Sequence, residues 1–215
     1  MKKFETLKLF YDEYPYKIVI YNSLSYIFRD KNLPYAKNVL DSLQYKYEKK
    51  EPLTLEQFKR ILPIDTEVFF EAKNLFIELS GRTDYKLRIQ NPYMQVYSLD
   101  YDWLMYLSKK IKSTTEFWEP TCLLEKGTIL VPHHKGYDYK VTLDSDVNPE
   151  LATWILNNPG KVKAGKVCLD TIKRQGYTRG LYLYVRDERV LQLLSLFTGK
   201  TQRIDKLVTT LNSDK

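Results

Sequence analysis

Histidine, cysteine and glycine are scarce in this chain, with 2, 2 and 8 of them among 215 residues. Because zinc in proteins is held mainly by histidine and cysteine, the small number of these residues disfavours a zinc site, and Cys122 and Cys168 lack metal-type spacing. Two lone cysteines also exclude a disulfide scaffold and fit a reducing compartment, so we interpret both as packing residues. The adjacent His133 and His134 are interpreted as surface residues of a linker.

Sequence motifs that hold nucleotides or catalytic groups are also missing. The chain has no Walker A sequence, no Gly-x-Gly-x-x-Gly loop and no Gly-x-Ser-x-Gly elbow. No apolar run approaches the roughly 20 residues that span a bilayer. The segment after Met1 lacks the apolar stretch of a signal peptide. We therefore expect a soluble, cytoplasmic protein with no membrane partner, no cofactor and no catalytic constellation.

The chain is instead rich in lysine, arginine and tyrosine. It has 34 Lys and Arg against 27 Asp and Glu, a net charge of +7, and 18 tyrosines. A modest positive charge favours polyanionic partners. A hydrophobic fraction of 43% indicates a globular fold, and the length allows one large domain or two small ones.

A strand-to-helix cassette occurs twice. Residues 96–100 and 183–187 are short β-type runs that end at Asp100 and Asp187. After each aspartate the apolar spacing becomes helical, which predicts a helix capped by that aspartate. A second recurrence has the pattern Tyr-Lys-apolar-any-apolar. It begins at Tyr16, Tyr85 and Tyr139 and predicts a strand at each of these places. Internal duplication and shared β composition both explain this second pattern.

The order of expected elements predicts an α+β protein made of two tandem halves, residues 1–132 and 137–215. In the first half we expect a hairpin over 16–29, helices beginning at Pro34, Thr54 and Asp65, strands at 85–89 and 94–98, a helix at 100–111, an irregular segment at 113–127 and a strand at 128–131. In the second half we expect strand 138–143, helix 148–157, strand 161–169, strand 180–186, helix 187–198 and strand 203–209, with a longer helix over 161–175 as an alternative.

This βαββαβ order is that of the split-βαβ, ferredoxin-like arrangement, in which two helices cover one face of a four-stranded antiparallel sheet. We expect both halves to adopt it, with extra helices inserted into the first half. The other face of each sheet would then be free to bind a partner.

The segment Arg179–Arg186 resembles the RNP1 motif of RNA-recognition domains in its opening Arg-Gly, its aromatic content and its place on a predicted third strand. The register differs, because the family has stacking aromatics at the third and fifth motif positions, where this chain has Leu181 and Leu183. Strand alternation nevertheless places Tyr182, Tyr184 and Arg186 together on the face away from the helices. A partner domain covering this face is the alternative.

Tyrosine rings on such a face can stack on nucleobases, for roughly 1–3 kcal/mol per base, and nearby cations can contact phosphates. The candidate binding residues follow from this reasoning. They are Tyr182, Tyr184, Arg186, Arg179, Lys161, Lys163 and Lys166. The alternative for the lysines is a solvated surface.

Two Asp-x-Asp pairs raise an enzymatic hypothesis, because paired carboxylates after a strand can bind Mg²⁺. They are Asp100 with Asp102 and Asp144 with Asp146. Helix capping and turn formation explain them equally well, and no third carboxylate is identifiable, so no metal site is predicted.

The leading hypothesis is therefore a non-enzymatic protein that binds single-stranded RNA or DNA on a sheet face. A structural or adaptor protein that uses its tandem domains for protein contacts or self-association is the second. Under this second hypothesis, the composition of the chain would suit a viral accessory protein or a virion component. A metal-dependent nuclease or nucleotidyl transferase is the third.

Overall fold

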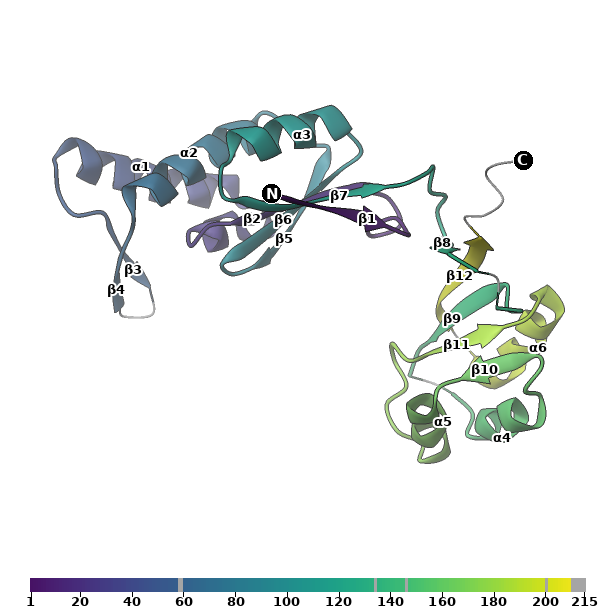
Figure 1. Cartoon of the computed structure of the whole chain (residues 1–215). Helices are drawn as coiled ribbons and strands as arrows, with labels where there is room; N and C mark the ends of the chain where they lie inside the picture. Colours follow the sequence, from purple (N-terminus) through teal and green to yellow (C-terminus); the bar gives the residue numbers. More distant parts are fainter. Residues whose placement is uncertain (58–59, 134, 146, 200, 210–215) are drawn as a thin grey trace. The chain divides into compact units, whose positions relative to one another are not determined.

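The computed structural model describes residues 1–57, 60–133, 135–145, 147–199 and 201–209. Contacts divide the chain into two compact units, Met1–Leu123 and Leu124–Lys215 (Figure 1). Each unit combines a five-stranded sheet with helices, so the predicted α+β class is confirmed.

The first unit contains one main sheet and a separate hairpin. Its strands are β1 (Lys2–Thr6), β2 (Tyr16–Tyr21), β3 (Thr54–Gln57), β4 (Arg60–Pro63), β5 (Tyr85–Gln90), β6 (Tyr93–Ser98) and β7 (Thr114–Pro120). Its helices are the 3-10 helix η1 (Ser25–Lys31), α1 (Leu33–Glu48), α2 (Thr66–Ser80) and α3 (Tyr101–Lys110). The sheet order is β1-β7-β2-β6-β5, and only β1 and β7 are parallel neighbours. Strands β3 and β4 form the hairpin.

The second unit is built around a single sheet. Its strands are β8 (Thr128–Val131), β9 (Tyr139–Leu143), β10 (Val162–Ala164), β11 (Tyr182–Val185) and β12 (Thr201–Thr209). Its helices are α4 (Glu150–Asn157), α5 (Lys166–Lys173) and α6 (Glu188–Thr198). The sheet order is β10-β11-β9-β12-β8, and only β8 and β12 are parallel neighbours.

The chain follows the same path through both sheets. We number the strands of each five-stranded sheet along the chain, starting from β2 in the first unit and from β9 in the second, and leave the separate hairpin β3–β4 out. In both sheets, strands one to four then lie in the order 4-1-3-2. In each unit one further strand, β1 or β8, lies parallel to strand four at the sheet edge. The two units are therefore copies of one topology, and all three Tyr-Lys recurrences lie on strands, namely β2, β5 and β9.

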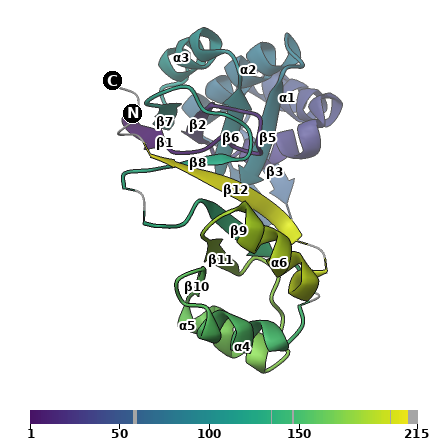
Figure 2. The ribbon, with the colours of Figure 1, turned by 90° about the vertical axis from the view of Figure 1, so that its right-hand side faces the viewer.

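The helices of each unit pack on one face of its sheet. In the first unit, Ile18 and Val96 are buried among apolar residues of α1, α2 and α3, which lie together on one side of the strands (Figures 1 and 2). In the second, Val141, Leu183 and Val185 are buried against α4, α5 and α6. Because side chains alternate along a strand, the residues between these positions occupy the opposite face.

Both cassette aspartates cap their helices, as the sequence predicted. The Oδ1 atom of Asp100 accepts a hydrogen bond of 2.9 Å from the Trp103 amide, and Oδ1 of Asp187 accepts one of 2.9 Å from the Val190 amide. Asp65 caps α2 in the same way, through the Glu67 amide at 2.7 Å. These bonds satisfy amides that the first turn of a helix leaves without partners.

The prediction of a second strand after the turn at residues 21–23 is wrong. The Asn22 side chain accepts a hydrogen bond of 2.8 Å from the Leu24 amide and starts a tight turn that continues into η1. Ile27 and Phe28 are buried in this 3-10 helix. The apolar run that predicted a strand therefore contributes to the core as part of a 3-10 helix.

The short helix predicted from Thr54 to Leu62 is also wrong, since β3 and β4 occupy this stretch. Leu53 is buried, Leu55 packs on the same core, and Glu56 is exposed. This period-two pattern overrides the helical spacing on which the prediction relied.

The fourth strand of the first sheet is not the predicted one. Strand β7 lies in the segment that was expected to be irregular, and it pairs with both β1 and β2. Residues 128–131 do form a strand, but as β8 they pair with β12 in the second unit. A register shift between Val19 and Ile20 accompanies β7, whose short run includes Glu116 and Pro120. The sequence alternation is correspondingly weak there.

Residues 161–169 were predicted as one strand and form two elements. Strand β10 ends at Ala164, and α5 begins at Lys166 after Gly165. Cys168 and Ile172 of α5 are buried in the core, four residues apart on one helix face. The alternative of a helix over 161–175 is therefore correct only for the later part of the segment.

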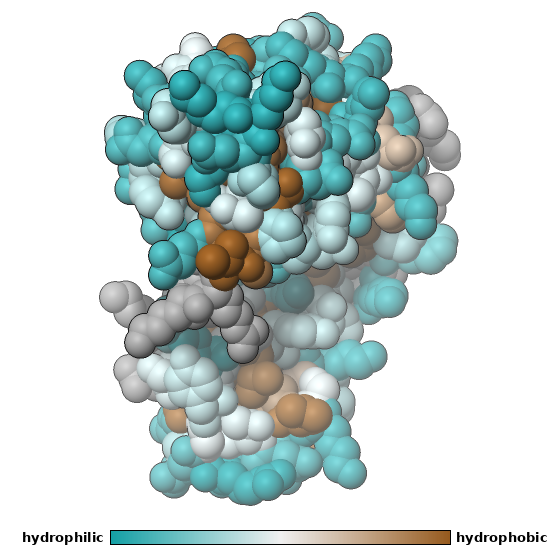
Figure 3. All heavy atoms as spheres, turned by 90° about the vertical axis from the view of Figure 1, so that its left-hand side faces the viewer, coloured by the Kyte–Doolittle hydropathy of each residue, from teal (hydrophilic) through white to brown (hydrophobic). Residues whose placement is uncertain are grey.

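Surface features bear on two further predictions. Cys168 is buried as predicted, whereas Cys122 is exposed and is not a packing residue. In the described part of the chain, no helix is long and apolar enough to cross a membrane. On the face seen in Figure 3, hydrophobic residues form small separate groups among hydrophilic ones.

The caps give a direct test of the cassette. Replacing Asp187 with alanine should lower the free energy of unfolding by about 1 kcal/mol, because the Val190 amide loses its partner. Asp187→Asn should keep most of that stability, since asparagine also caps helices. Urea denaturation measures both changes. An alanine variant as stable as the native chain would show that the cap does not stabilise the helix.

Candidate nucleic-acid interface

The two sheets share a row of three side chains on the face away from the helices, formed by a lysine, a tyrosine and a second lysine on neighbouring strands. The first row is Lys86, Tyr97 and Lys17, and the second row is Lys163, Tyr184 and Lys140. In both rows the tyrosine is directly paired with both lysines, on strands two, three and one of the common order. The repetition extends from topology to the identity of these side chains.

A second tyrosine accompanies the central one in each unit. Tyr14 and Tyr137 each lie two residues before the strand's initial tyrosine, in the pattern Tyr-x-Tyr-Lys. The ring centroids of Tyr14 and Tyr97 are 6.4 Å apart, and those of Tyr137 and Tyr184 are 6.3 Å apart. Tyr137 is not among the residues predicted from the sequence, although extending the Tyr-Lys recurrence by two residues identifies it.

The first row is closed by its own chain. Residues 7–15, which connect β1 to β2, bring Phe10 and Tyr11 against Tyr97, with ring centroids 5.4 and 5.0 Å away. The Nζ atom of Lys86 lies 3.8 Å from the Tyr11 ring centroid, and that of Lys17 lies 3.9 Å from the Trp118 ring centroid. Only 3% of Tyr97 is exposed.

Burial changes the proton affinities of the closed row. It lowers the pKa of Lys17, although the nearby Glu116 carboxylate acts in the opposite direction. Burial also raises the pKa of Tyr97 well above its usual range, with a further contribution from Tyr11. The first row is thus a packed aromatic and cationic cluster, with little room for a ligand.

The second row is more open. Tyr182 lies next to it on the same face and is 47% exposed, while Lys163 is exposed and Tyr184 is partly buried. The ring centroids of Tyr182 and Tyr184 are 5.7 Å apart, and the Nζ atom of Lys140 lies 4.1 Å from the Tyr182 ring centroid. Partial burial, with a smaller contribution from Tyr182, raises the pKa of Tyr184. Tyr184 therefore remains uncharged at neutral pH.

The other candidate cations are distributed around this face. The amide of Arg186 donates a 2.9 Å hydrogen bond to the carbonyl of Lys161, so these two exposed residues lie at the same end of neighbouring strands. Lys166 is the first residue of α5, which packs on the opposite face, and therefore lies apart from the tyrosines. The Nε atom of Arg179 lies 3.8 Å from Oδ1 of Asp144.

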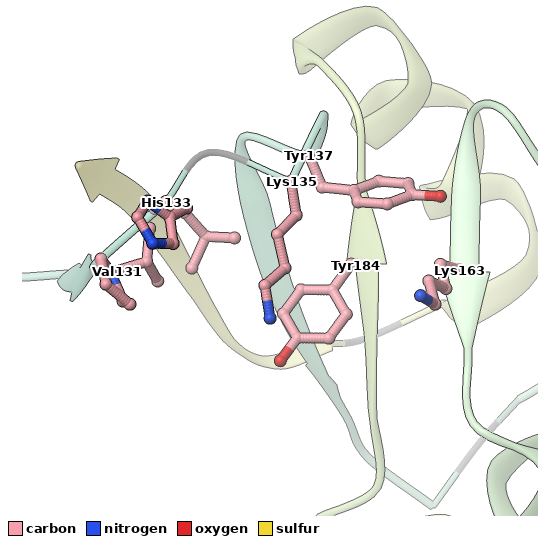
Figure 4. Close-up of a pocket in the computed structure, with 8 residues that line it drawn as sticks. Val131, His133, Lys135, Tyr137, Lys163 and Tyr184 are labelled. Carbon is pink, nitrogen blue, oxygen red and sulfur yellow. The ribbon is translucent and has the colours of Figure 1, made fainter.

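A cavity of about 180 Å³ lies beside the second row (Figure 4). Its walls come from described residues of the connection between β8 and β9 and from four strands of the sheet, β8, β10, β11 and β12. The lining residues are Val131, Pro132, His133, Lys135, Tyr137, Lys163, Tyr184 and Leu207. The segment that was interpreted as a linker thus contributes His133 and Lys135 to the neighbourhood of two candidate residues, while His134 lies outside the described residues.

The aspartate pairs have structural partners. Asp100 caps α3 and also accepts a 2.8 Å hydrogen bond from Arg82, and the cap together with this guanidinium lowers the pKa of its carboxyl group. Asp144 lies near Arg179, and Asp146 is outside the described residues. Within the described ranges no three His, Cys, Asp or Glu side chains are grouped to hold a metal ion.

Comparison of the chain with protein-family models, with curated proteins and with solved structures finds no match. The class of function is therefore inferred from the geometry of the two sheets.

The difference between the rows can be measured as stability. Tyr97→Ala should lower the free energy of unfolding by about 3 kcal/mol or more, because a buried ring leaves a cavity. Tyr184→Ala should cost less than half as much, since its ring is partly exposed. Chemical denaturation of the two variants decides this. Equal losses would mean that the second row is as closed as the first.

Proposed function

We propose that this protein binds single-stranded nucleic acid on the second unit, on the sheet face that carries Tyr182 and the second row. The observation that carries the proposal is the open row itself, in which a lysine, a tyrosine and a lysine lie next to an exposed second tyrosine. The closed first row has the same residues but is covered by Phe10 and Tyr11. The second unit is therefore the proposed binding unit.

The spacing of the tyrosines suits neighbouring bases. Tyr182 and Tyr184 are two residues apart on one strand, and their ring centroids are 5.7 Å apart. Two unpaired bases of one strand can reach rings at this separation, whereas the bases of a duplex are hidden in its interior. Base stacking on tyrosine is tolerant of sequence, so the proposed binding has little base preference.

The proposed phosphate contacts come from cations at the margins of the tyrosines. Lys161, Lys163 and Arg186 are exposed, and in the described part of the chain neither Lys161 nor Lys163 has a side-chain hydrogen bond or ion pair. Arg179 contributes from the segment before β11, where Asp144 offsets part of its charge. Lys166 is left out of the proposed contact surface because it lies on α5.

The fold proposed for both units is the ferredoxin-like, split-βαβ arrangement. The order 4-1-3-2 with antiparallel neighbours supports it in each unit. The edge strands β1 and β8, the hairpin β3–β4 and helix α5 are additions to this arrangement. In the first unit, η1, α1 and α2 also stand where the arrangement has one helix, between β2 and β5. In it, the face without helices is the one available to ligands.

Fluorescence anisotropy with a labelled, mixed-sequence 12-nucleotide single strand tests the proposal. The native chain should bind at low salt, and Tyr182→Ala should weaken binding about tenfold, which corresponds to the loss of about 1.4 kcal/mol of stacking. Lys163→Ala should reduce the salt dependence, because one phosphate contact is lost.

Two exposed residues of the same unit provide matched controls. The controls are Tyr177→Ala and Lys173→Ala. Tyr177 lies in the segment before β11, and Lys173 lies on α5, which packs on the other face of the sheet. Both controls should bind like the native chain. Absence of binding at low salt would refute the proposal, as would equal effects of the Tyr182 and Tyr177 substitutions.

A further inference from the structure

The first unit shows what the repeated row accommodates. Its connection between β1 and β2 places the rings of Phe10 and Tyr11 against Tyr97. Lys86 and Lys17 approach these added rings, with Nζ 3.8 Å from the Tyr11 centroid and 4.9 Å from the Phe10 centroid. A lysine-tyrosine-lysine row on this sheet therefore binds aromatic rings by ring-ring and cation–π contacts.

The second unit has the same row, but in its described residues no ring corresponds to Phe10 or Tyr11. Its connection, residues 132–138, is shorter than residues 7–15 and keeps only the tyrosine that matches Tyr14, namely Tyr137. Where the first unit places Phe10 and Tyr11, this connection has no aromatic residue other than His133 and the undescribed His134. The cavity of about 180 Å³ lies between this connection and Tyr184.

The cavity has the size and the charge for one ring with an anionic group attached. An apolar cavity of about 150 Å³ is large enough to hold benzene. The described lining residues include Lys135, Lys163 and His133 and no aspartate or glutamate. Figure 4 shows Lys135 extended beside the Tyr184 ring, with Tyr137 reaching over from the same connection.

We propose that this cavity holds one nucleobase of the bound strand, with its ring packed against Tyr184 and Tyr137 and its phosphate near Lys135 and Lys163. The base takes the place that the aromatic rings of residues 7–15 occupy in the first unit. This inference rests on the proposed function and adds a defined pocket for a single nucleotide to the open tyrosine face. Tyr182 then stacks on a neighbouring base outside the cavity.

The test uses adenosine 5′-monophosphate and the full chain, with the ring signals of Tyr137 and Tyr184 followed by NMR. The nucleotide should shift both signals, whereas ribose 5-phosphate and inorganic phosphate should leave them unchanged. Equal shifts with inorganic phosphate would overturn the proposal, because they would indicate an anion site without base recognition. Unchanged signals with the nucleotide would also overturn it.

Cavity-filling variants separate this proposal from the proposed function. Leu207→Trp and Val131→Phe should each abolish the nucleotide-induced shifts and weaken binding of the 12-nucleotide strand about tenfold. Leu193→Trp, at an exposed position of α6, is the control and should change neither. Thermal melting identifies a filling variant that fails to fold, and the other variant then decides.

The outcomes distinguish the two claims. If the strand binds and Tyr182→Ala weakens it, but both folded filling variants bind normally, the cavity proposal is wrong and the proposed function stands. If the 12-nucleotide single strand does not bind, both the proposed function and the cavity proposal are wrong.

Discussion

The pairing of strand one with strand three is the constraint on which the rest of the structure depends. It places Lys17 opposite Tyr97 and Lys140 opposite Tyr184. Because side chains alternate faces, a slip of one residue would move Ile18 or Val141 out of the core and each lysine into it. Burial of the apolar set therefore fixes the position of the polar row in both units.

The connections before strand one then give the two rows different properties. In the first unit, Phe10 and Tyr11 complete an aromatic cluster around lysines that burial would otherwise destabilise. Tyr11 adopts this position with a φ of 56°, a conformation that is costly for a bulky residue. In the second unit the shorter connection leaves a cavity, and Gly136 supports its turn with a φ of 78°. The same sheet thus serves as a closed core in one copy and as an open surface in the other.

Much of the fold follows from local signals in the sequence. The strands beginning at the Tyr-Lys pairs, the capped helices and the orientation of Tyr182 and Tyr184 depend on alternation and capping, which neighbouring residues determine. The partner of β8 could not be predicted, because nothing in the sequence of a short parallel edge strand indicates which distant strand it pairs with. The covering of the first row and the cavity beside the second row depend on where a connecting loop crosses the sheet, which local sequence does not determine. Lys166 lies on α5, away from the tyrosines, because a helix begins there.

Amide NMR mapping of the labelled full chain during titration with the mixed-sequence single strand is the most direct test of the proposed binding surface. We expect shift changes to concentrate on β9, β10, β11 and residues 132–138, while β2, β5 and β6 in the first unit stay unchanged. Changes centred on the first row or on the helices of the second unit would contradict it, as would the absence of any change.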